Sequence, residues 1–168
     1  HVVPRVTAVE LQTALPAVLS GVGSQVGGFL NDAALARHAG LNPVTCRRYR
    51  TLLGAVYLLL AVPPWSRSKG KPYVKAPKLY FTDTTLLCHL LRVDPAMLLQ
   101  QYPALAQGVV ENFVASELTK QLARPENSGA LSHVHTYDGQ GVEFVIERPD
   151  GRLVGITVTT SATVSEAD

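Results

Sequence analysis

The chain has 168 residues, of which 46% are hydrophobic and 17% are charged, and its formal net charge is +2. This composition excludes an intrinsically disordered chain, and the length allows one domain or two small ones. No apolar run reaches the ~18 residues that a transmembrane helix needs, and no signal peptide is evident. We therefore expect a cytoplasmic protein that does not enter a membrane.

The charges are distributed unevenly along the chain. The interval between Asp32 and Asp83 contains nine of the 15 Lys and Arg residues and no acidic residue. From Ala104 onward the balance reverses, with nine acidic residues against four basic ones. Because the two halves differ in charge, we expect two units with different roles, residues 1–103 and residues 104–168.

The first element is a helix over residues 7–20, whose apolar side chains recur at helical spacing. Pro16 predicts that this helix is bent or split, and the glycine-rich residues 21–28 are expected to end it. No lysine follows these glycines at the spacing of a phosphate-binding loop, so we interpret them as a connection.

A helix-turn-helix pattern follows. Asn31 and Asp32 favour an N-cap for a helix over residues 33–39, which Gly40 is expected to end. Pro43 suits the first turn of a second helix that ends near residue 57. Three of its residues are expected to face the core: Leu52, Leu53 and Val56. In such units the early residues of the second helix enter the major groove of DNA. Those residues are Thr45, Arg47, Arg48, Tyr49 and Arg50. The alternative is a solvated basic face or a docking face.

Residues 63–77 form a basic loop, rich in Gly and Pro, between two apolar runs that predict strands at residues 58–62 and 78–81. This pattern is typical of a hairpin with a cationic tip, and a helix-turn-helix followed by such a hairpin is a winged helix. Trp65 and Tyr73 flank the cations, where they can stack on bases, but a Trp beside two prolines favours packing. The cations expected to contact phosphates are Arg67, Lys69, Lys71, Lys75 and Lys78.

The remaining pattern predicts helices at residues 83–91 and 95–101, a long helix at residues 104–123, and three strands. The strands are expected at residues 133–137, 142–147 and 153–160, separated by turn sequences. A helix followed by a three-stranded meander is an α+β unit, so the predicted fold class of the whole chain is α+β.

Metal-ligand spacings are absent. Cys46 and Cys88 have no second Cys or His at a suitable distance and are expected to be reduced, buried thiols. His133 and His135 share a strand face, but no third ligand is evident. We predict no metal site and no cofactor in this chain.

Several runs resemble a large prokaryotic family of AAA-type ATPases. They are PPWSRSKGKPYVKAPKLYFTDTTLL, GVVENFVASELTKQL, VEFVIE and LVGITVTTSAT. Members of that family combine an N-terminal ATPase, a winged helix and a C-terminal domain of unknown function with a restriction-endonuclease-like fold. The resemblance implies a winged helix followed by a partial nuclease-like domain. ATP and Mg²⁺ would be expected only if an ATPase domain lies upstream.

The nuclease-like fold holds a divalent cation with two carboxylates and positions a water molecule with a lysine. By resemblance, the family's aspartate corresponds to Glu143, its glutamate to Thr157 and its lysine to Thr159. Glu111 adds one further carboxylate. Threonines supply neither the second charge nor the ammonium, so Glu143 and Glu111 are vestigial candidates, and we predict no catalytic residue.

Three hypotheses follow for the function. The first is a non-catalytic nucleic-acid-binding module that contacts DNA through its cationic half. The second is an interaction module, in which the cationic half docks on an ATPase domain or on the acidic half. The third is a metal-dependent nuclease. If the last strand, residues 153–160, lies at an exposed edge, it can pair with a second copy of the chain.

Overall fold

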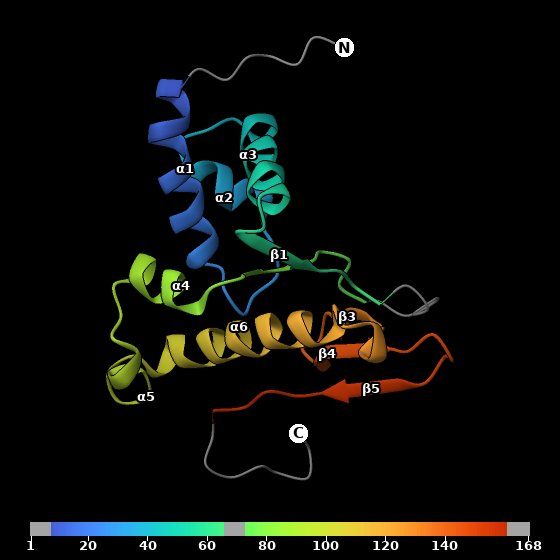
Figure 1. The fold of residues 1–168 in the computed structure, drawn as a ribbon. Helices are drawn as coiled ribbons and strands as arrows, with labels where there is room; N and C mark the ends of the chain where they lie inside the picture. Colours follow the sequence, from blue (N-terminus) through green and yellow to red (C-terminus); the bar gives the residue numbers. More distant parts are fainter. Residues whose placement is uncertain (1–7, 66–72, 161–168) are drawn as a thin grey trace, which may run out of the picture.

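The computed structural model describes residues 8–65 and 73–160, and their side chains from Thr13 onward (Figure 1). The fold is α+β, as predicted. The elements are α1 (Ala8–Gly23), α2 (Asp32–His38), α3 (Pro43–Ala55), β1 (Leu59–Val62), β2 (Lys78–Phe81), α4 (Thr84–Leu91), the 3-10 helix η1 (Pro95–Met97), α5 (Leu98–Gln101), α6 (Pro103–Leu122), the 3-10 helix η2 (Pro125–Asn127), β3 (Ala130–His135), β4 (Gly141–Glu147) and β5 (Leu153–Ile156). Within the described ranges, no helix is both long and apolar enough to cross a membrane.

Local capping fixes α2 and α3 where the sequence predicts them. The Asn31 side chain accepts a hydrogen bond from the Ala34 N–H, and the Asn42 side chain accepts one from the Thr45 N–H. Gly40 follows α2 with a φ of +63°, a conformation in which glycine carries no steric penalty. The helix-turn-helix unit therefore owes its shape to residues that are readable from the sequence.

α1 ends at Gly23, within the glycine-rich residues 21–28 that were expected to end it. Pro16, which was predicted to bend or split the helix, lies inside one continuous helix, so the helix is not split. Gly21 lies against α2, and a Cβ added there would come within 2.7 Å of Leu35 Cδ1 and 2.9 Å of His38 Cδ2. Gly21 therefore serves close helix packing instead of helix termination.

The buried face of α3 is also displaced from the predicted one. Cys46, Tyr49 and Leu53 are buried at helical spacing, whereas Leu52 and Val56 are 43% and 54% exposed. The prediction for Leu52 and Val56 is wrong: Leu52 lies off the face that the three buried positions form, and Val56 is the C-cap residue, where α3 has already ended.

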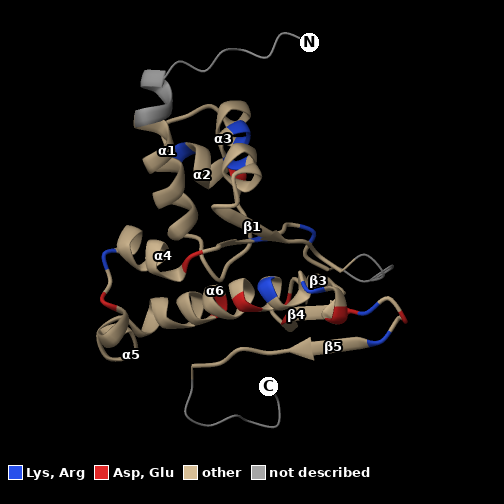
Figure 2. Cartoon of the chain, viewed as in Figure 1, with Lys and Arg blue, Asp and Glu red and all other residues tan. Residues whose placement is uncertain are grey.

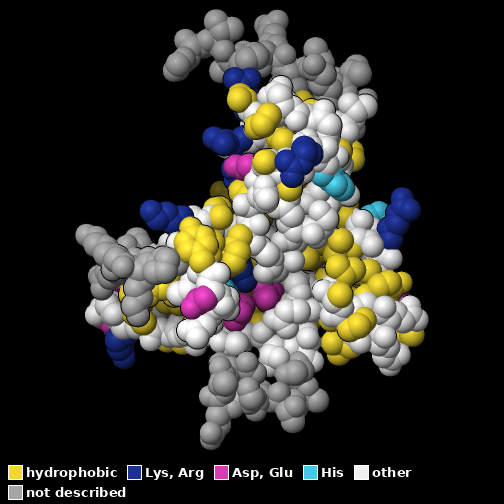
Figure 3. Space-filling view, turned by 180° about the vertical axis from the view of Figure 1, so that it is seen from behind, with side chains coloured by type: hydrophobic (Ala, Val, Ile, Leu, Met, Phe, Trp, Pro, Cys, Tyr) yellow, Lys and Arg dark blue, Asp and Glu magenta, His cyan; other side chains and the backbone are white. Residues whose placement is uncertain are grey.

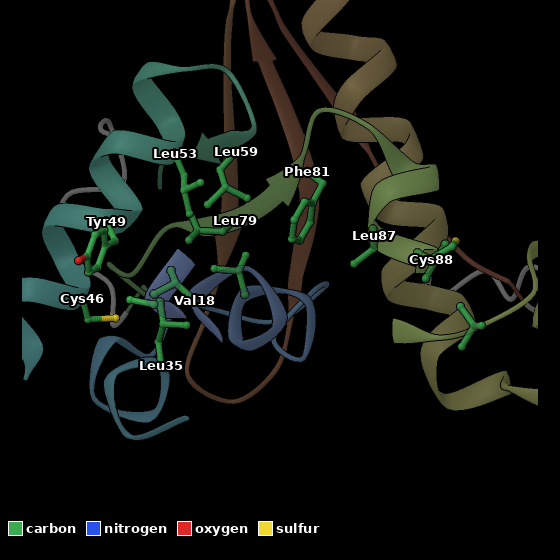
Figure 4. Packing of buried hydrophobic residues seen from close by; sticks show 14 of the residues in the cluster. Val18, Leu35, Cys46, Tyr49, Leu53, Leu59, Leu79, Phe81, Leu87 and Cys88 are labelled. Carbon is green, nitrogen blue, oxygen red and sulfur yellow. The ribbon is translucent and has the colours of Figure 1, made fainter. Parts of the chain in front are cut away.

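The first core joins α1–α4 to the antiparallel pair β1–β2, in which Leu59 faces Phe81 and Val62 faces Lys78. Figure 4 shows the buried side chains that converge from these elements: Val18, Leu35, Cys46, Tyr49, Leu53, Leu59, Leu79, Phe81, Leu87 and Cys88. Both cysteines are buried and unpaired, as predicted, and burial raises the pKa of each thiol.

The second core lies between α6 and the meander β3–β4–β5. Val62 and Tyr80 enter it from the first sheet, and Ala115 and Phe144 enter it from α6 and β4. The first half of α6 belongs to the first core through Ala106 and Val109. The long helix therefore contributes to both cores, and it runs below β1 in Figure 1.

The last strand is shorter than predicted. β5 pairs with β4 from Leu153 to Ile156 only. Beyond it, the backbone turns to the side chain of Gln107: its Nε2 donates to Val158 O at 2.6 Å, and its Oε1 accepts from the Thr160 N–H at 3.1 Å. These hydrogen bonds to α6 replace the ladder that residues 157–160 were expected to continue.

Candidate nucleic-acid interface

The first half of α3 carries the residues that were predicted to face the groove. Of these, Tyr49 does not: it is 3% exposed and packs in the first core, so that prediction is wrong. Arg47 and Arg48 are exposed, and Thr45 is half-buried. Together with Val44 and Thr51, the two arginines line a shallow hollow of 330 Å³ on the outer side of the helix. Figure 2 shows basic residues along α3, and both acidic and basic residues along α6 and at the turn between β4 and β5.

Asp32 at the start of α2 divides the arginines into two kinds. Its carboxylate lies 3.3 Å from Arg50 Nε and 3.7 Å from Arg47 Nε, and the Arg50 side chain is only 20% exposed. Arg48 forms no ion pair within the part of the chain that the structure describes. A ligand therefore meets the full charge of Arg48, while the charge of Arg50 is already largely balanced.

The cations of the predicted hairpin are partly visible. Lys75 is exposed, and Arg67, Lys69 and Lys71 lie outside the described residues. Trp65 donates its indole N–H to Glu147 Oε2 at 2.9 Å, which agrees with the packing interpretation of this residue.

Lys78 does not belong to the interface, so the prediction that it contacts phosphates is wrong. Its side chain is 3% exposed, and its ammonium lies 3.1 Å from Glu111 Oε2 and 5.6 Å from the centre of the Phe29 ring. All four residues of β2 are buried because the first core covers one face of the strand and α6 covers the other.

Glu111, the further carboxylate named as a vestigial candidate, is engaged inside the protein. Its oxygens accept hydrogen bonds from Lys78, from the Tyr80 hydroxyl at 3.1 Å and from Gln107 at 3.1 Å. Burial and the neighbouring Glu111 carboxylate raise the pKa of Tyr80, so the phenol stays protonated as a donor. Glu111 is 4% exposed, and these three donors satisfy its carboxylate inside the protein.

Glu143 lies at the edge of an open, polar pocket of 680 Å³. The structure brings together there the positions that the resemblance implies, since Thr157 and Thr159 line the same wall. Glu143 Oε1 lies 3.5 Å from His135 Nε2, and its other oxygen accepts from the Val158 N–H at 3.4 Å. Burial alone would raise the pKa of Glu143, but the His135 hydrogen bond, backbone donors and the Lys78 charge hold it below its usual value.

The pocket wall therefore offers one carboxylate, two hydroxyls and the amides of Gln107 and Gln140. Gln107 already binds Glu111 and the residues beyond β5. Among the residues that the structure describes, no group of three or more His, Cys, Asp or Glu side chains is arranged to hold a metal ion. Such a donor set suits weak polar contacts and does not suit the two-carboxylate chemistry of a nuclease.

The sequence did not predict that Lys78, Tyr80 and Glu111 form a buried polar cluster, which half-buried Gln107 joins through Glu111. A signal was present: Lys78 and Tyr80 point to one side of a strand at period two, and Gln107 and Glu111 lie one turn apart on a helix.

Seen from behind, the molecule shows basic side chains around the helical layer and acidic side chains gathered below them at the centre of the face (Figure 3).

Comparisons with known proteins place the chain among uncharacterised relatives. Uncharacterized proteins of Mycobacterium bovis and of Mycobacterium tuberculosis are each 30% identical to it over 139 residues, which cover 83% of this chain. The aligned part is 30% of the length of either relative. No solved structure matches the chain significantly. The model of a domain of unknown function, DUF8612, matches residues 3–97, more than half of the sequence, and the chain therefore belongs to the DUF8612 family.

Proposed function

We propose that the chain is a nucleic-acid-binding module without catalytic activity, in which residues 1–103 form a winged helix and residues 104–168 a degenerate nuclease-like scaffold. The observation that carries the proposal is the outer face of α3. Arg48 and Arg47 extend from the second helix of a helix-turn-helix unit, and Arg48 has no ion-pair partner in the described ranges. In such units this part of the helix faces the major groove.

The electrostatic surroundings support the same proposal. Asp32 is the only carboxylate between Glu10 and Asp83 in the sequence, and it is occupied by Arg47 and Arg50. Arg48 and Lys75 are both exposed, and no acidic residue lies between them in the sequence. Association of such cations with phosphates releases counterions and weakens steeply with salt.

Fluorescence anisotropy with a short labelled DNA duplex, repeated over a KCl series, tests the proposal. For Arg47→Ala/Arg48→Ala we expect weaker binding and a salt slope reduced by up to about 1.8, since each lost phosphate contact is worth about 0.9. The matched control, Arg124→Ala/Arg148→Ala, removes two exposed arginines from the other unit and should keep the wild-type slope. Absence of binding by the wild-type protein at low salt would exclude the proposal.

A second candidate function has its own observation. Val44, Leu52, Val56 and Tyr57 are 62%, 43%, 54% and 82% exposed on and just after α3. Apolar side chains in such number on one element favour docking against another protein, such as an ATPase domain of the kind that the resemblance implies. Leu52→Ser/Val56→Ser separates the candidates, because it should abolish protein docking and leave the salt slope of DNA binding unchanged.

The nuclease alternative is the least supported. Glu111 is buried and paired with Lys78, and the pocket beside Glu143 has threonines at the positions of the carboxylate and the lysine. We expect supercoiled plasmid to stay intact in the presence of Mg²⁺ or Mn²⁺. Cleavage that disappears in Glu143→Ala would favour the nuclease instead.

A further inference from the structure

The two chain segments that lead into and out of residues 66–72 lie along β3, in the other unit. On the incoming side, the His133 N–H donates to Pro63 O and the Trp65 N–H donates to His133 O, both at 2.9 Å. On the outgoing side, the Val74 N–H donates to His135 O at 2.8 Å. Pro64 pairs with His133 in parallel fashion, and Tyr73 pairs with Thr136 in antiparallel fashion. The base of the basic hairpin is thus an extension of the C-terminal sheet.

A buried histidine adds a side-chain contact to this arrangement. His133 is fully buried, packs its ring 5.5 Å from that of Phe29, and lies with Nε2 3.0 Å from Ala76 O. Burial lowers the pKa of His133 to about 4, and the nearby His135 and Lys78 act in the same direction, while the bond to Ala76 opposes them. The ring is therefore neutral near pH 7, and it carries its proton on Nε2 because the carbonyl can only accept.

These contacts hold the residues on both sides of one exposed cation. The Val74 N–H is bound by β3, the Ala76 carbonyl is bound by His133, and Lys75 lies between them with its side chain in solvent. In an extended segment successive side chains alternate in direction, so fixing Val74 inward directs Lys75 outward. The incoming segment has a side-chain anchor as well: Glu147 of β4 accepts the indole N–H of Trp65.

We propose that β3 and β4 position Lys75 as a nucleic-acid contact, with His133 and Trp65 as positioning residues. This inference rests on the proposed function and extends it. In addition to the cations of residues 1–103, strands of the acidic C-terminal part would then contribute to nucleic-acid binding by positioning Lys75. A cation on an anchored segment loses less conformational freedom on binding than one on an unanchored segment. Releasing the anchor should therefore weaken binding although no charge is removed.

The test is a double-mutant cycle on DNA affinity and its salt slope. Lys75→Gln should lower the slope by about 0.9, the loss of one phosphate contact. Trp65→Phe keeps an aromatic ring and loses the bond to Glu147, and it should weaken binding several-fold. If Trp65 acts through Lys75, adding Trp65→Phe to Lys75→Gln changes affinity no further. Additive effects would overturn the proposal, because they would show that Trp65 acts elsewhere.

Conservative and matched variants keep the result independent of folding. Glu147→Gln retains an oxygen that can accept the indole proton and should bind like the wild type, whereas Glu147→Leu should reproduce the loss seen in Trp65→Phe. Hydrogen exchange at the Val74 amide reports the anchor without DNA. We expect protection in the wild-type protein and faster exchange in Trp65→Phe.

The two failures are distinguishable. A protected Val74 amide in a protein that binds no DNA would refute the proposed function and, with it, the role of Lys75. An unprotected Val74 amide in a protein that does bind DNA would refute only the positioning of Lys75 by β3, and the proposed function would stand.

Discussion

Asn112 of α6 makes a direct polar connection to β2. It is fully buried and binds both backbone groups of one residue in β2: its Oδ1 accepts from the Phe81 N–H at 2.6 Å, and its Nδ2 donates to Phe81 O at 3.1 Å. The same amide nitrogen donates to Thr84 Oγ1 at 3.0 Å. The side chain thus acts as a short stretch of neighbouring strand, held by a helix.

Asn112→Ala should be strongly destabilising. It leaves the N–H and C=O of Phe81 without partners, and each unsatisfied buried group costs about 1–3 kcal/mol. Since Phe81 is itself fully buried, water cannot restore these bonds without disrupting the core. We expect a loss of about 3–5 kcal/mol, a large part of the 5–15 kcal/mol that stabilises a typical domain.

Urea denaturation provides the measurement, followed by the fluorescence of the single tryptophan, Trp65, and by circular dichroism. Asn112→Leu separates the polar term from the cavity, because leucine fills a similar volume and forms no hydrogen bond. It should remain at least about 2 kcal/mol less stable than the wild type. The exposed Asn127→Ala is the control and should change stability by less than about 0.5 kcal/mol. If Asn112→Leu is as stable as the wild type, the pairing with Phe81 contributes nothing and the reasoning is refuted.

Other predictions concern stability as well. Lys78→Met should cost about 3–5 kcal/mol because it leaves the Glu111 carboxylate buried without its cation, and Lys78→Met/Glu111→Leu should recover most of that loss in a double-mutant cycle. The folded-state pKa of His133, about 4, lies below the ordinary value of 6.5, so the unfolded chain takes up its proton first. The contribution of neutral His133 to the free energy of unfolding is complete above pH 6.5. It is lost as the pH falls toward 4, by about 3 kcal/mol in total. In His133→Gln, the urea midpoint should no longer show this decrease between pH 6.5 and pH 4. Gly108→Ala should destabilise by about 1–3 kcal/mol, since its Cβ would lie 2.7 Å from Val26 O, whereas Gly54→Ala, with its nearest contact 4.0 Å away, should stabilise by about 0.5–1 kcal/mol in thermal unfolding.

The local features of the fold were predictable because short-range chemistry determines them. Asn31, Gly40 and Asn42 act within one turn of their own position, and the structure places the caps where the sequence suggests. Asp83 likewise accepts from the Thr85 and Leu86 N–H groups at the start of α4. The strand pair β1–β2 follows from two apolar runs around a turn-rich loop, and its observed bounds agree with the prediction to within one residue.

The errors share one physical origin, which is that burial depends on partners distant in sequence. Lys78 is a lysine like exposed Lys75 nearby in the sequence, and nothing local distinguishes the two. What buries Lys78 is its partner Glu111, which lies 33 residues away on another element. Leu52 and Val56 have the hydrophobicity of core residues, but no element of the described structure covers them. After β5, hydrogen bonds to the side chain of Gln107 replace the strand pairing of residues 157–160. The sequence of the strand itself gives no indication of these bonds, because Gln107 lies on another element.

The burial of Lys78 changes the meaning of the charge asymmetry along the chain. The acid-free interval supplies a cation to the acidic unit, and the acidic unit supplies Glu111 and Glu147 as partners for Lys78 and Trp65. Part of the opposite charge of the two halves is therefore internal complementarity between packed units. Among the described residues, exposed cations such as Arg48 and Lys75 face solvent, and removal of a charge at these positions should alter binding without altering stability.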